Sequence, residues 1–450
     1  MAAHTTAPAA VSSLLARYRT VRAATLAFTA PLSPEDMMVQ SCPEASPVKW
    51  HLAHTTWFFE TFVLTPYSPA YKPFHKDFHW LFNSYYNSLG DMPAKNLRSS
   101  FSRPPLDDIL AYRAHVDRSI AKLLESELGT NEFDILSRIT LGLEHEQQHL
   151  ELAATDIKHA LFTNPLHPAY NVSENPGAPS QSASSIEVGF TKFSGGLVNI
   201  GTTPDPTDPH AFAFDNETPQ HKVFLQPFEL ASRLVTVRDY LAFINDNGYT
   251  RPELWLSEGW TTNCAEKWQA PLYWNRTDDT PSGWVIFTLA GFKCLDELAD
   301  TPVCHLSFFE ADAFARWSGC RLPTEFEWEH ATLQVLSSPT ANMLETGNLH
   351  PTPTPLSSFA GGGGPASALS LQQMYGDVWE WTASPYTGYP GYKPLPGALG
   401  EYNGKFMSSQ IILRGGSCVT PAAHIRPTYR NFFHPATRWQ VSGLRLARNP

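Results

Sequence analysis

The chain has 450 residues, of which 42% are hydrophobic and 17% charged, and its net charge is −11. This length exceeds one ordinary hydrophobic core, so two or three domains are expected. The negative charge and the absence of any Lys/Arg run argue against nucleic-acid binding, and no stretch approaches the ~20 apolar residues of a membrane span. The N-terminal sequence does not resemble a signal peptide, and the six scattered cysteines form no C-x-x-C pair, so we expect a cytoplasmic protein with reduced thiols.

The first third of the chain has the pattern of a helical bundle. Ser46-Pro47 signals a helix start, because Ser caps the backbone N–H groups and Pro fits the first helical position. A loop rich in Tyr, Phe, His and Pro covers residues 65–105. Four helices with one long loop fit an up-down bundle, in which metal ligands commonly project inward. The predicted helices cover about residues 12–28, 47–64, 106–127 and 132–162.

The last of these helices carries the motif H-E-Q-Q-H, from His145 to His149. Two histidines four residues apart lie on one face of a helix, so both imidazoles can reach a single metal ion. The second predicted helix contains His51 and His54, and only one of them is expected to point into the bundle as a third ligand. Three histidines with open coordination positions indicate a catalytic metal rather than a structural one.

The same motif fits the H-E-x-x-H pattern of zinc proteases, with Glu146 as general base. The extended metzincin motif requires Gly and His where this chain has Leu152 and Thr155. A Glu ligand further along the chain would still complete such a site, so a zinc hydrolase is an alternative. A small peptidase does not explain the large aromatic second half of the chain.

The composition changes after the bundle, and the predicted fold class is α+β. Residues 1–165 are assigned to the bundle, 166–186 to a linker and 187–450 to a second domain. The Pro-, Ser- and Asn-rich linker sequence is also compatible with an ordered excursion over the bundle surface. In the second domain, helices are predicted over residues 235–248 and 307–319, and a third is predicted from Thr324.

Three stretches of the second half carry a family resemblance. They are L-P-T-E-F-E-W-E at 322–329, G-D-V-W-E-W-T at 376–382 and R-G-G-S at 414–417. They recur in this order in the formylglycine-generating-enzyme-like fold, also called the sulfatase-modifying-factor fold. That fold is C-type-lectin-like and has little regular secondary structure.

Within these motifs the aromatic residues and glycine are expected to serve the scaffold, namely Trp328, Trp379, Trp381 and Gly415. Formylglycine-generating enzymes use a pair of cysteines shortly after R-G-G-S. Here Cys418 has no second cysteine after it. Formylglycine formation is therefore not expected, and Cys418 is interpreted as a buried packing residue.

The combination of both halves resembles the sulfoxide synthases of ergothioneine biosynthesis, which join a DinB-like four-helix bundle to this fold. The resemblance implies non-haem Fe(II) as cofactor, with O2 as oxidant. It implies that a thiol is joined to C2 of the imidazole of hercynine, the trimethylated histidine. Mapped by motif, the iron ligands of the family fall on His54, His145 and His149. A related carbon–sulfur or carbon–selenium synthase acting on another histidine derivative is an alternative.

The stretch R-N-F-F-H-P at 430–435 resembles a family segment R-N-W-D-x-P-x-R. Asn431 and the aromatic Phe432 match it, but Phe433 replaces the Asp and Thr437 stands at the position of the second Arg. In members that use γ-glutamylcysteine, that Asp and Arg hold the glutamyl portion. Losing both charges suggests a smaller sulfur donor, so we expect free cysteine rather than γ-glutamylcysteine.

The resemblance also implies substrate contacts. A trimethylammonium group favours aromatic faces, which Phe432 and Phe433 would supply, with Gln148 as a further contact and Asn431 for the hercynine carboxylate. The carboxylate of the sulfur donor needs a cationic partner. The candidates are Arg103, Arg98 and Arg438.

The expected reaction needs a proton donor near the bound O2, and a Tyr hydroxyl suits that role. Members of the family place such a Tyr shortly after G-D-V-W-E-W-T, where Tyr386 and Tyr389 are available. The long bundle loop offers Tyr85 and Tyr86, flanked by Asn residues. We favour Tyr86 or Tyr85 over Tyr386.

Overall fold

A computed structural model of the chain describes residues 7–170, 188–334, 341–354 and 371–450. The chain divides into two compact units. The first takes the described part of Met1–Asn164 together with two later segments, Thr203–Phe214 and Pro394–Asn403, and the second takes the rest. Most of the linker predicted at 166–186 lies outside the described residues.

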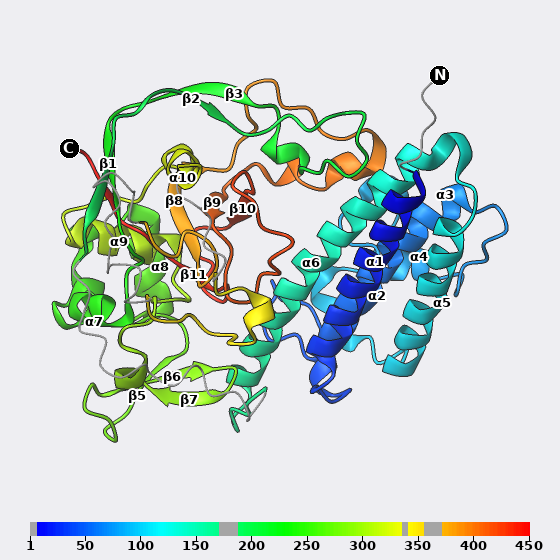
Figure 1. The fold of residues 1–450 in the computed structure, drawn as a ribbon. Coiled ribbons are helices and arrows are strands. Elements are labelled where there is room, and N and C mark those ends of the chain that lie inside the picture. Colours follow the sequence, from blue (N-terminus) through cyan, green and yellow to red (C-terminus); the bar gives the residue numbers. More distant parts are fainter. Residues whose placement is uncertain (1–6, 171–187, 335–340, 355–370) are drawn as a thin grey trace. The chain divides into compact units, whose positions relative to one another are not determined.

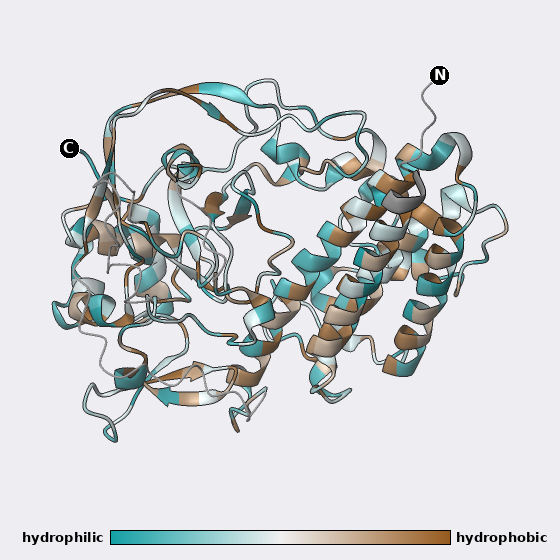
Figure 2. Cartoon of the chain, in the orientation of Figure 1, coloured by the Kyte–Doolittle hydropathy of each residue, from teal (hydrophilic) through white to brown (hydrophobic). Residues whose placement is uncertain are grey.

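The first unit is built on four long helices, as predicted (Figure 1). They are α1 (Ala7–Thr29), α2 (Val48–Phe59), α5 (Leu106–Leu124) and α6 (Glu132–Thr163). Short helices α3 (Thr65–Tyr67) and α4 (Phe78–Leu81) and 3-10 turns at Asn87–Leu89 and Lys95–Ser100 occupy the predicted loop. Figure 2 shows hydrophobic and hydrophilic residues alternating along the long helices of this unit.

The second predicted helix departs from α geometry before its end. After Phe59 the chain makes a π-helical turn, Glu60–Leu64. Pro66 follows, and it has no N–H to give to the carbonyl of Phe62 as an α-helix would require. Arg138 donates to that carbonyl instead, at 3.2 Å. A missing backbone donor and a side-chain replacement therefore accompany the change of helix type.

Helix α2 is buried along all of its 12 residues, and it packs closely against α6. Gly142 in α6 makes this approach possible, because a Cβ built there would lie 2.5 Å from Cε1 of Phe59. The glycine stands one turn before His145 on α6. It thereby brings the histidines of the two helices within reach of one another.

In its described residues, the second unit consists of small sheets joined by long connections, with four α-helices. Its helices are α7 (Val237–Asn245), α8 (Ser257–Glu266), α9 (Phe308–Trp317) and α10 (Glu325–Thr332). The three predicted helices are confirmed, and Thr236, Ser307 and Thr324 each form a capping box at the start of one.

Within the described ranges of the second unit the strands form four sheets, and every strand pairing there is antiparallel except that of β11 with β8. The sheet orders are β1-β4-β12, β10-β9-β8-β11, β2-β3 and β5-β6-β7. In chain order the strands are Phe190–Phe193, Gly196–Ile200, His221–Leu225, Phe228–Ala231, Trp274–Arg276, Trp284–Thr288, Gly291–Cys294, Trp379–Pro385, Ile411–Arg414, Asn431–Phe433, Ser442–Gly443 and Ala447–Arg448.

The motif residues of the second half lie in the interior of this unit. Trp328, Trp379 and Trp381 are each fully buried, as expected of scaffold residues. Gly415 has a φ of +98°, and a Cβ there would lie 2.9 Å from the carbonyl oxygen of Met374, so the turn requires glycine. Cys418 is buried, as expected of a packing residue.

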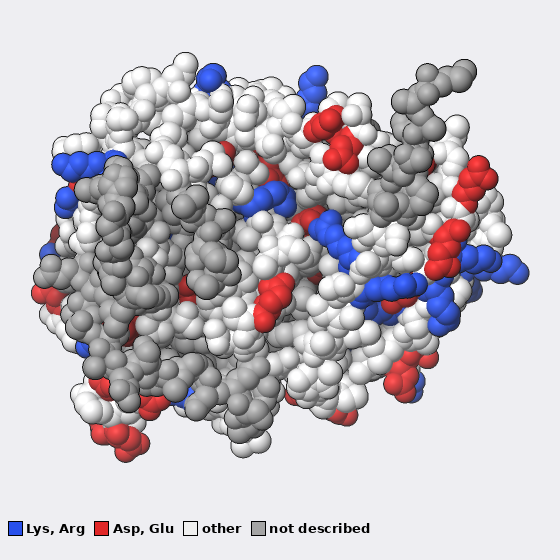
Figure 3. All heavy atoms as spheres, in the orientation of Figure 1, with Lys and Arg blue, Asp and Glu red and all other residues white. Residues whose placement is uncertain are grey.

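Charged side chains on the face drawn in Figure 3 are interspersed, with Lys and Arg close to Asp and Glu. An exposed example in the second unit is Arg251, which pairs with both Asp246 and Glu253. Within the described ranges, no helix combines the length and hydropathy needed to cross a bilayer.

Candidate metal centre

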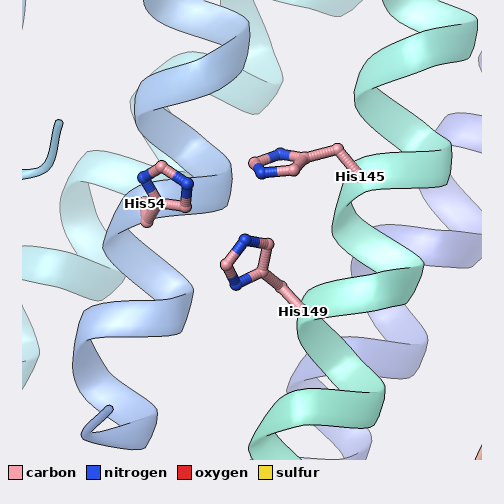
Figure 4. A group of neighbouring side chains, drawn as sticks. All are labelled: His54, His145 and His149. Carbon is pink, nitrogen blue, oxygen red and sulfur yellow. The ribbon is translucent and has the colours of Figure 1, made fainter. Parts of the chain in front are cut away.

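Three histidines from two helices converge in the first unit. His54 comes from α2, and His145 and His149 come from successive turns of α6. All three are buried, and each offers a ring nitrogen within 4.8 Å of the nitrogens offered by the others. Figure 4 shows the three rings turned toward one another. The structure thus brings together the three residues that the sequence analysis expected as ligands.

The hydrogen bonds of these rings leave nitrogen lone pairs for a metal. Nδ1 of His54 donates to the backbone carbonyl of Phe82 at 2.7 Å, so Nε2 carries the lone pair, and it has no hydrogen-bond partner. Neither ring nitrogen of His145 has a partner. Buried polar atoms without partners are costly. A bound cation would satisfy them, so the residues present fit a metal.

The electrostatics of the three rings favour the neutral, ligating form. Burial lowers the pKa of His145 to about 3. Burial and the proximity of His145 also lower the pKa values of His54 and His149 well below the usual value. Metal binding requires neutral imidazole. The site is therefore poised to accept a cation without first releasing protons.

Aromatic rings hold His54 in place. Its imidazole is stacked between Trp50 and Trp57, at centroid distances of 4.5 and 5.4 Å. His51, the other histidine of the same helix, instead contacts His149, with 2.8 Å between their Nδ1 atoms. Packing thus gives the two histidines of α2 different partners.

Glu146 lies between the two histidines in sequence, but its carboxylate is engaged elsewhere in the bundle. One oxygen accepts from Thr25 Oγ1 at 2.8 Å and from Arg113, and the other accepts from Arg22 at 2.9 Å. Burial alone would raise the pKa of Glu146, but Arg113 and Arg22 lower it to about 2. A carboxylate held by two buried guanidinium groups is a poor general base, which counts against the zinc-hydrolase alternative.

A tyrosine that the sequence analysis did not single out lies beside the histidines. Tyr402 belongs to the segment Pro394–Asn403 of the first unit, and its ring centroid is 5.5 Å from that of His145. Its hydroxyl donates to Oε1 of Gln148, and its ring stacks on Phe214. Tyr402 lies more than 250 positions beyond Gln148 and has no local motif, so sequence periodicity gave no signal for it.

The loop tyrosines lie in the same region. Tyr86 is fully buried with its ring 5.5 Å from Trp57, and Tyr85 is 6.0 Å from Tyr402. Burial raises the pKa of Tyr86 well above its usual value, so the hydroxyl keeps its proton. The carboxylate of Glu401 accepts from the backbone N–H groups of the turn that follows, Asn87–Leu89. This contact joins the loop to the segment that carries Tyr402.

Of the candidate arginines, Arg98 lies over Trp50, the ring that stacks on His54. It is buried, its guanidinium lies 3.5 Å from the ring centroid of Trp50, and it donates to Ser46 and Ser84. Burial lowers the pKa of Arg98 to about 9. A buried cation of this kind attracts an anionic ligand.

The other two arginines have different surroundings. Arg103 is exposed at the end of the bundle loop. Arg438 belongs to the second unit, where its guanidinium pairs with buried Glu310 at 2.8 Å and lies over Trp268.

The remaining predicted substrate residues also belong to the second unit. Asn431, Phe432 and Phe433 form strand β10 and are half-buried. The Asn431 side chain accepts from the backbone N–H of Phe432, and Phe432 stacks on Tyr386 at 4.0 Å between centroids. The Tyr386 hydroxyl accepts from Asn216 at 3.0 Å. These residues form one aromatic and amide cluster in that unit.

Comparison with known proteins places each half in a family. Residues 17–153 match the DinB superfamily, and residues 179–450 match the sulfatase-modifying factor enzyme 1-like domain. The hercynine oxygenase of Mycolicibacterium smegmatis is 32% identical over 458 aligned residues, which cover 96% of both chains. That of Mycobacterium tuberculosis is 36% identical over 52% of this chain and 56% of its own. The formylglycine-generating enzyme of Thermomonospora curvata is 26% identical over 60% of this chain and 97% of its own.

Proposed function

The chain belongs to the hercynine oxygenase family, and we propose that it is an iron(II)-dependent sulfoxide synthase acting on hercynine and cysteine. The family and the two-part α+β fold predicted from the motifs are both confirmed by these relatives. The observation that carries the proposal is the buried triad of His54, His145 and His149 with its unpartnered nitrogens.

The proposed reaction joins the cysteine sulfur to C2 of the hercynine imidazole. The C2–H and S–H bonds break, a C–S bond forms, one oxygen atom of O2 is bound to sulfur, and the other leaves as water. When bound, Fe(II) would lower the pKa of the thiol and activate O2. Neutral imidazole ligands and open positions suit this metal. The residues of the chain supply orientation and protons.

For the proton we propose Tyr86, supported by its burial and raised pKa. A protonated phenol in this position can act as a general acid. Without the proton that this phenol supplies, we expect the thiol to be oxidised without formation of the C–S bond. Tyr402 then has a separate task. By donating to Gln148 it fixes that amide, one position before His149, as a contact for hercynine.

For the sulfur donor we propose free cysteine, with its carboxylate on Arg98. Arg98 is the buried candidate, and a charge-assisted hydrogen bond to a carboxylate is strong where water is excluded. Phe433 and Thr437 offer no charge to a glutamyl group. The nearby Arg438 already pairs with Glu310. A longer donor therefore has no evident partner in that stretch.

The test is O2 consumption by the iron-loaded protein with hercynine and either cysteine or γ-glutamylcysteine, with the product identified by mass. Hercynine-dependent uptake that yields hercynylcysteine sulfoxide is expected. No hercynine-dependent uptake with either thiol would refute the assignment, whereas faster turnover with γ-glutamylcysteine would refute only the choice of donor. Separately, Tyr86→Phe should divert turnover toward cysteine sulfinic acid, and an unchanged product ratio would move the proton donor to another residue.

A further inference from the structure

A line of buried polar side chains leads away from the candidate metal centre. His51 Nδ1 lies 2.8 Å from His149 Nδ1, and His51 Nε2 lies 3.1 Å from Oδ2 of Asp156. Asp156 stands seven residues after His149 on α6, so both lie on the same face of that helix. The backbone N–H of Ser46 donates to the same Asp156 oxygen at 2.8 Å, which fixes the carboxylate.

One assignment of tautomers satisfies both ring contacts with neutral imidazoles and an accepting carboxylate. An ionised carboxylate only accepts, so Nε2 of His51 carries the proton that it shares with Asp156. Neutral imidazole has one N–H, so His51 Nδ1 is an acceptor. In this assignment Nδ1 of His149 is the donor of the 2.8 Å contact, and its Nε2 carries the lone pair.

We infer that His51 and Asp156 are positioning residues of the metal centre. They hold His149 in the Nδ1–H tautomer and present its Nε2 lone pair to the ion. This inference rests on the proposed function, because it takes the three histidines as the metal ligands. It assigns a role to His51, the histidine that the triad leaves out.

The three ligands then have three different supports. His54 donates to a backbone carbonyl, His149 donates to an imidazole backed by a carboxylate, and His145 has neither and is packed against Phe58 at 4.8 Å. A carboxylate at the end of a hydrogen-bonded chain raises the basicity of the ligand. Of the three ligands, His149 therefore depends most on its hydrogen-bonded supports, His51 and Asp156. Loss of His51 should weaken the bond of this one ligand to the metal.

The experiment measures the dissociation constant and the visible absorption of Co(II), an O2-independent probe, in the full-length protein. His51→Phe removes the acceptor while keeping an aromatic ring, and we expect about 10- to 100-fold weaker binding with an altered spectrum. His51→Asn should stay within about threefold of wild type, because its side-chain oxygen can still accept from His149 Nδ1. Asp156→Asn should fall between these two. His115→Asn is the control, since His115 lies on α5 and contacts the backbone carbonyl of Lys72.

Wild-type affinity and an unchanged spectrum in His51→Phe would overturn the inference. Equal losses of Co(II) affinity in His51→Phe and His51→Asn would also overturn it. If His51 only filled space, it would not matter that Asn carries a hydrogen-bond acceptor and Phe does not. If His51→Phe does not fold, Asp156→Asn decides the matter, with weaker binding supporting the inference and unchanged binding refuting it. Failure of the wild-type protein to bind Co(II) would instead refute the proposed metal centre itself.

Discussion

The substitution Glu146→Gln removes a negative charge that faces two buried guanidinium groups, those of Arg22 and Arg113. Arg22 keeps a second ion pair, with Asp117 at 2.7 Å. The two arginines lower the pKa of the Glu146 carboxyl from a usual 4.5 to about 2, although burial by itself would raise it. Each pKa unit corresponds to about 1.4 kcal/mol, so the carboxylate contributes about 3 kcal/mol to stability. This agrees with the ~3–5 kcal/mol cost of breaking a buried pair.

The pH dependence follows with a definite sign. A carboxyl whose pKa is depressed in the folded state stabilises that state above its unfolded pKa, and the contribution is lost as the pH falls through the folded value. The stabilisation by Glu146 should therefore be complete above about pH 4.5 and disappear toward pH 2. Because Gln resembles the protonated carboxyl, the difference between wild type and Glu146→Gln should shrink over the same interval.

The assay is urea unfolding of the full-length protein followed by helical circular dichroism at several pH values. Glu125→Gln is the matched control, since Glu125 is 63% exposed and 3.7 Å from Arg19. Its effect should stay within about 0.5 kcal/mol. Unchanged stability of Glu146→Gln together with lost activity would refute the structural role and indicate that Glu146 acts in the reaction itself.

Further substitutions test other parts of the site. Gly142→Ala should cost about 1–3 kcal/mol in unfolding free energy and weaken metal binding, because its Cβ would meet the Phe59 ring; normal stability would contradict that close approach. Tyr402→Phe should lower kcat/KM for hercynine about tenfold by removing the hydroxyl that donates to Gln148, and an unchanged value in steady-state kinetics would show that Tyr402 does not act at the site. Arg98→Met should raise KM for cysteine about 10- to 100-fold with a smaller change in kcat, whereas an effect on kcat alone would place the thiol carboxylate elsewhere.

The spacing of residues along the sequence predicted those features that lie within a single helix. The four bundle helices follow from caps and apolar periodicity, and the facing pair His145 and His149 follows from 3.6 residues per turn. The π-helical turn at Glu60–Leu64 was not predicted, because it depends on tertiary replacement of a backbone donor by Arg138.

The rest of the site depends on contacts between distant segments. The placement of Tyr402 beside His145 joins residues of two separate stretches in one unit, which no periodicity reports. The different tasks of His51 and His54 depend on how α2 is rotated against α6, because both residues share one broad face of their helix. Helical spacing shows which histidines share a face of α2, whereas the packing of α2 against α6 decides which partners each of them contacts.

The most direct test of the proposed function is turnover of hercynine and cysteine under ¹⁸O2 by protein loaded anaerobically with Fe(II). We expect one O2 to be consumed per hercynylcysteine sulfoxide, with one labelled oxygen in the product, and this turnover to be lost when any one of His54, His145 and His149 is replaced by Ala. An unlabelled product, or hercynine-independent O2 uptake that survives these replacements, would contradict the proposed function.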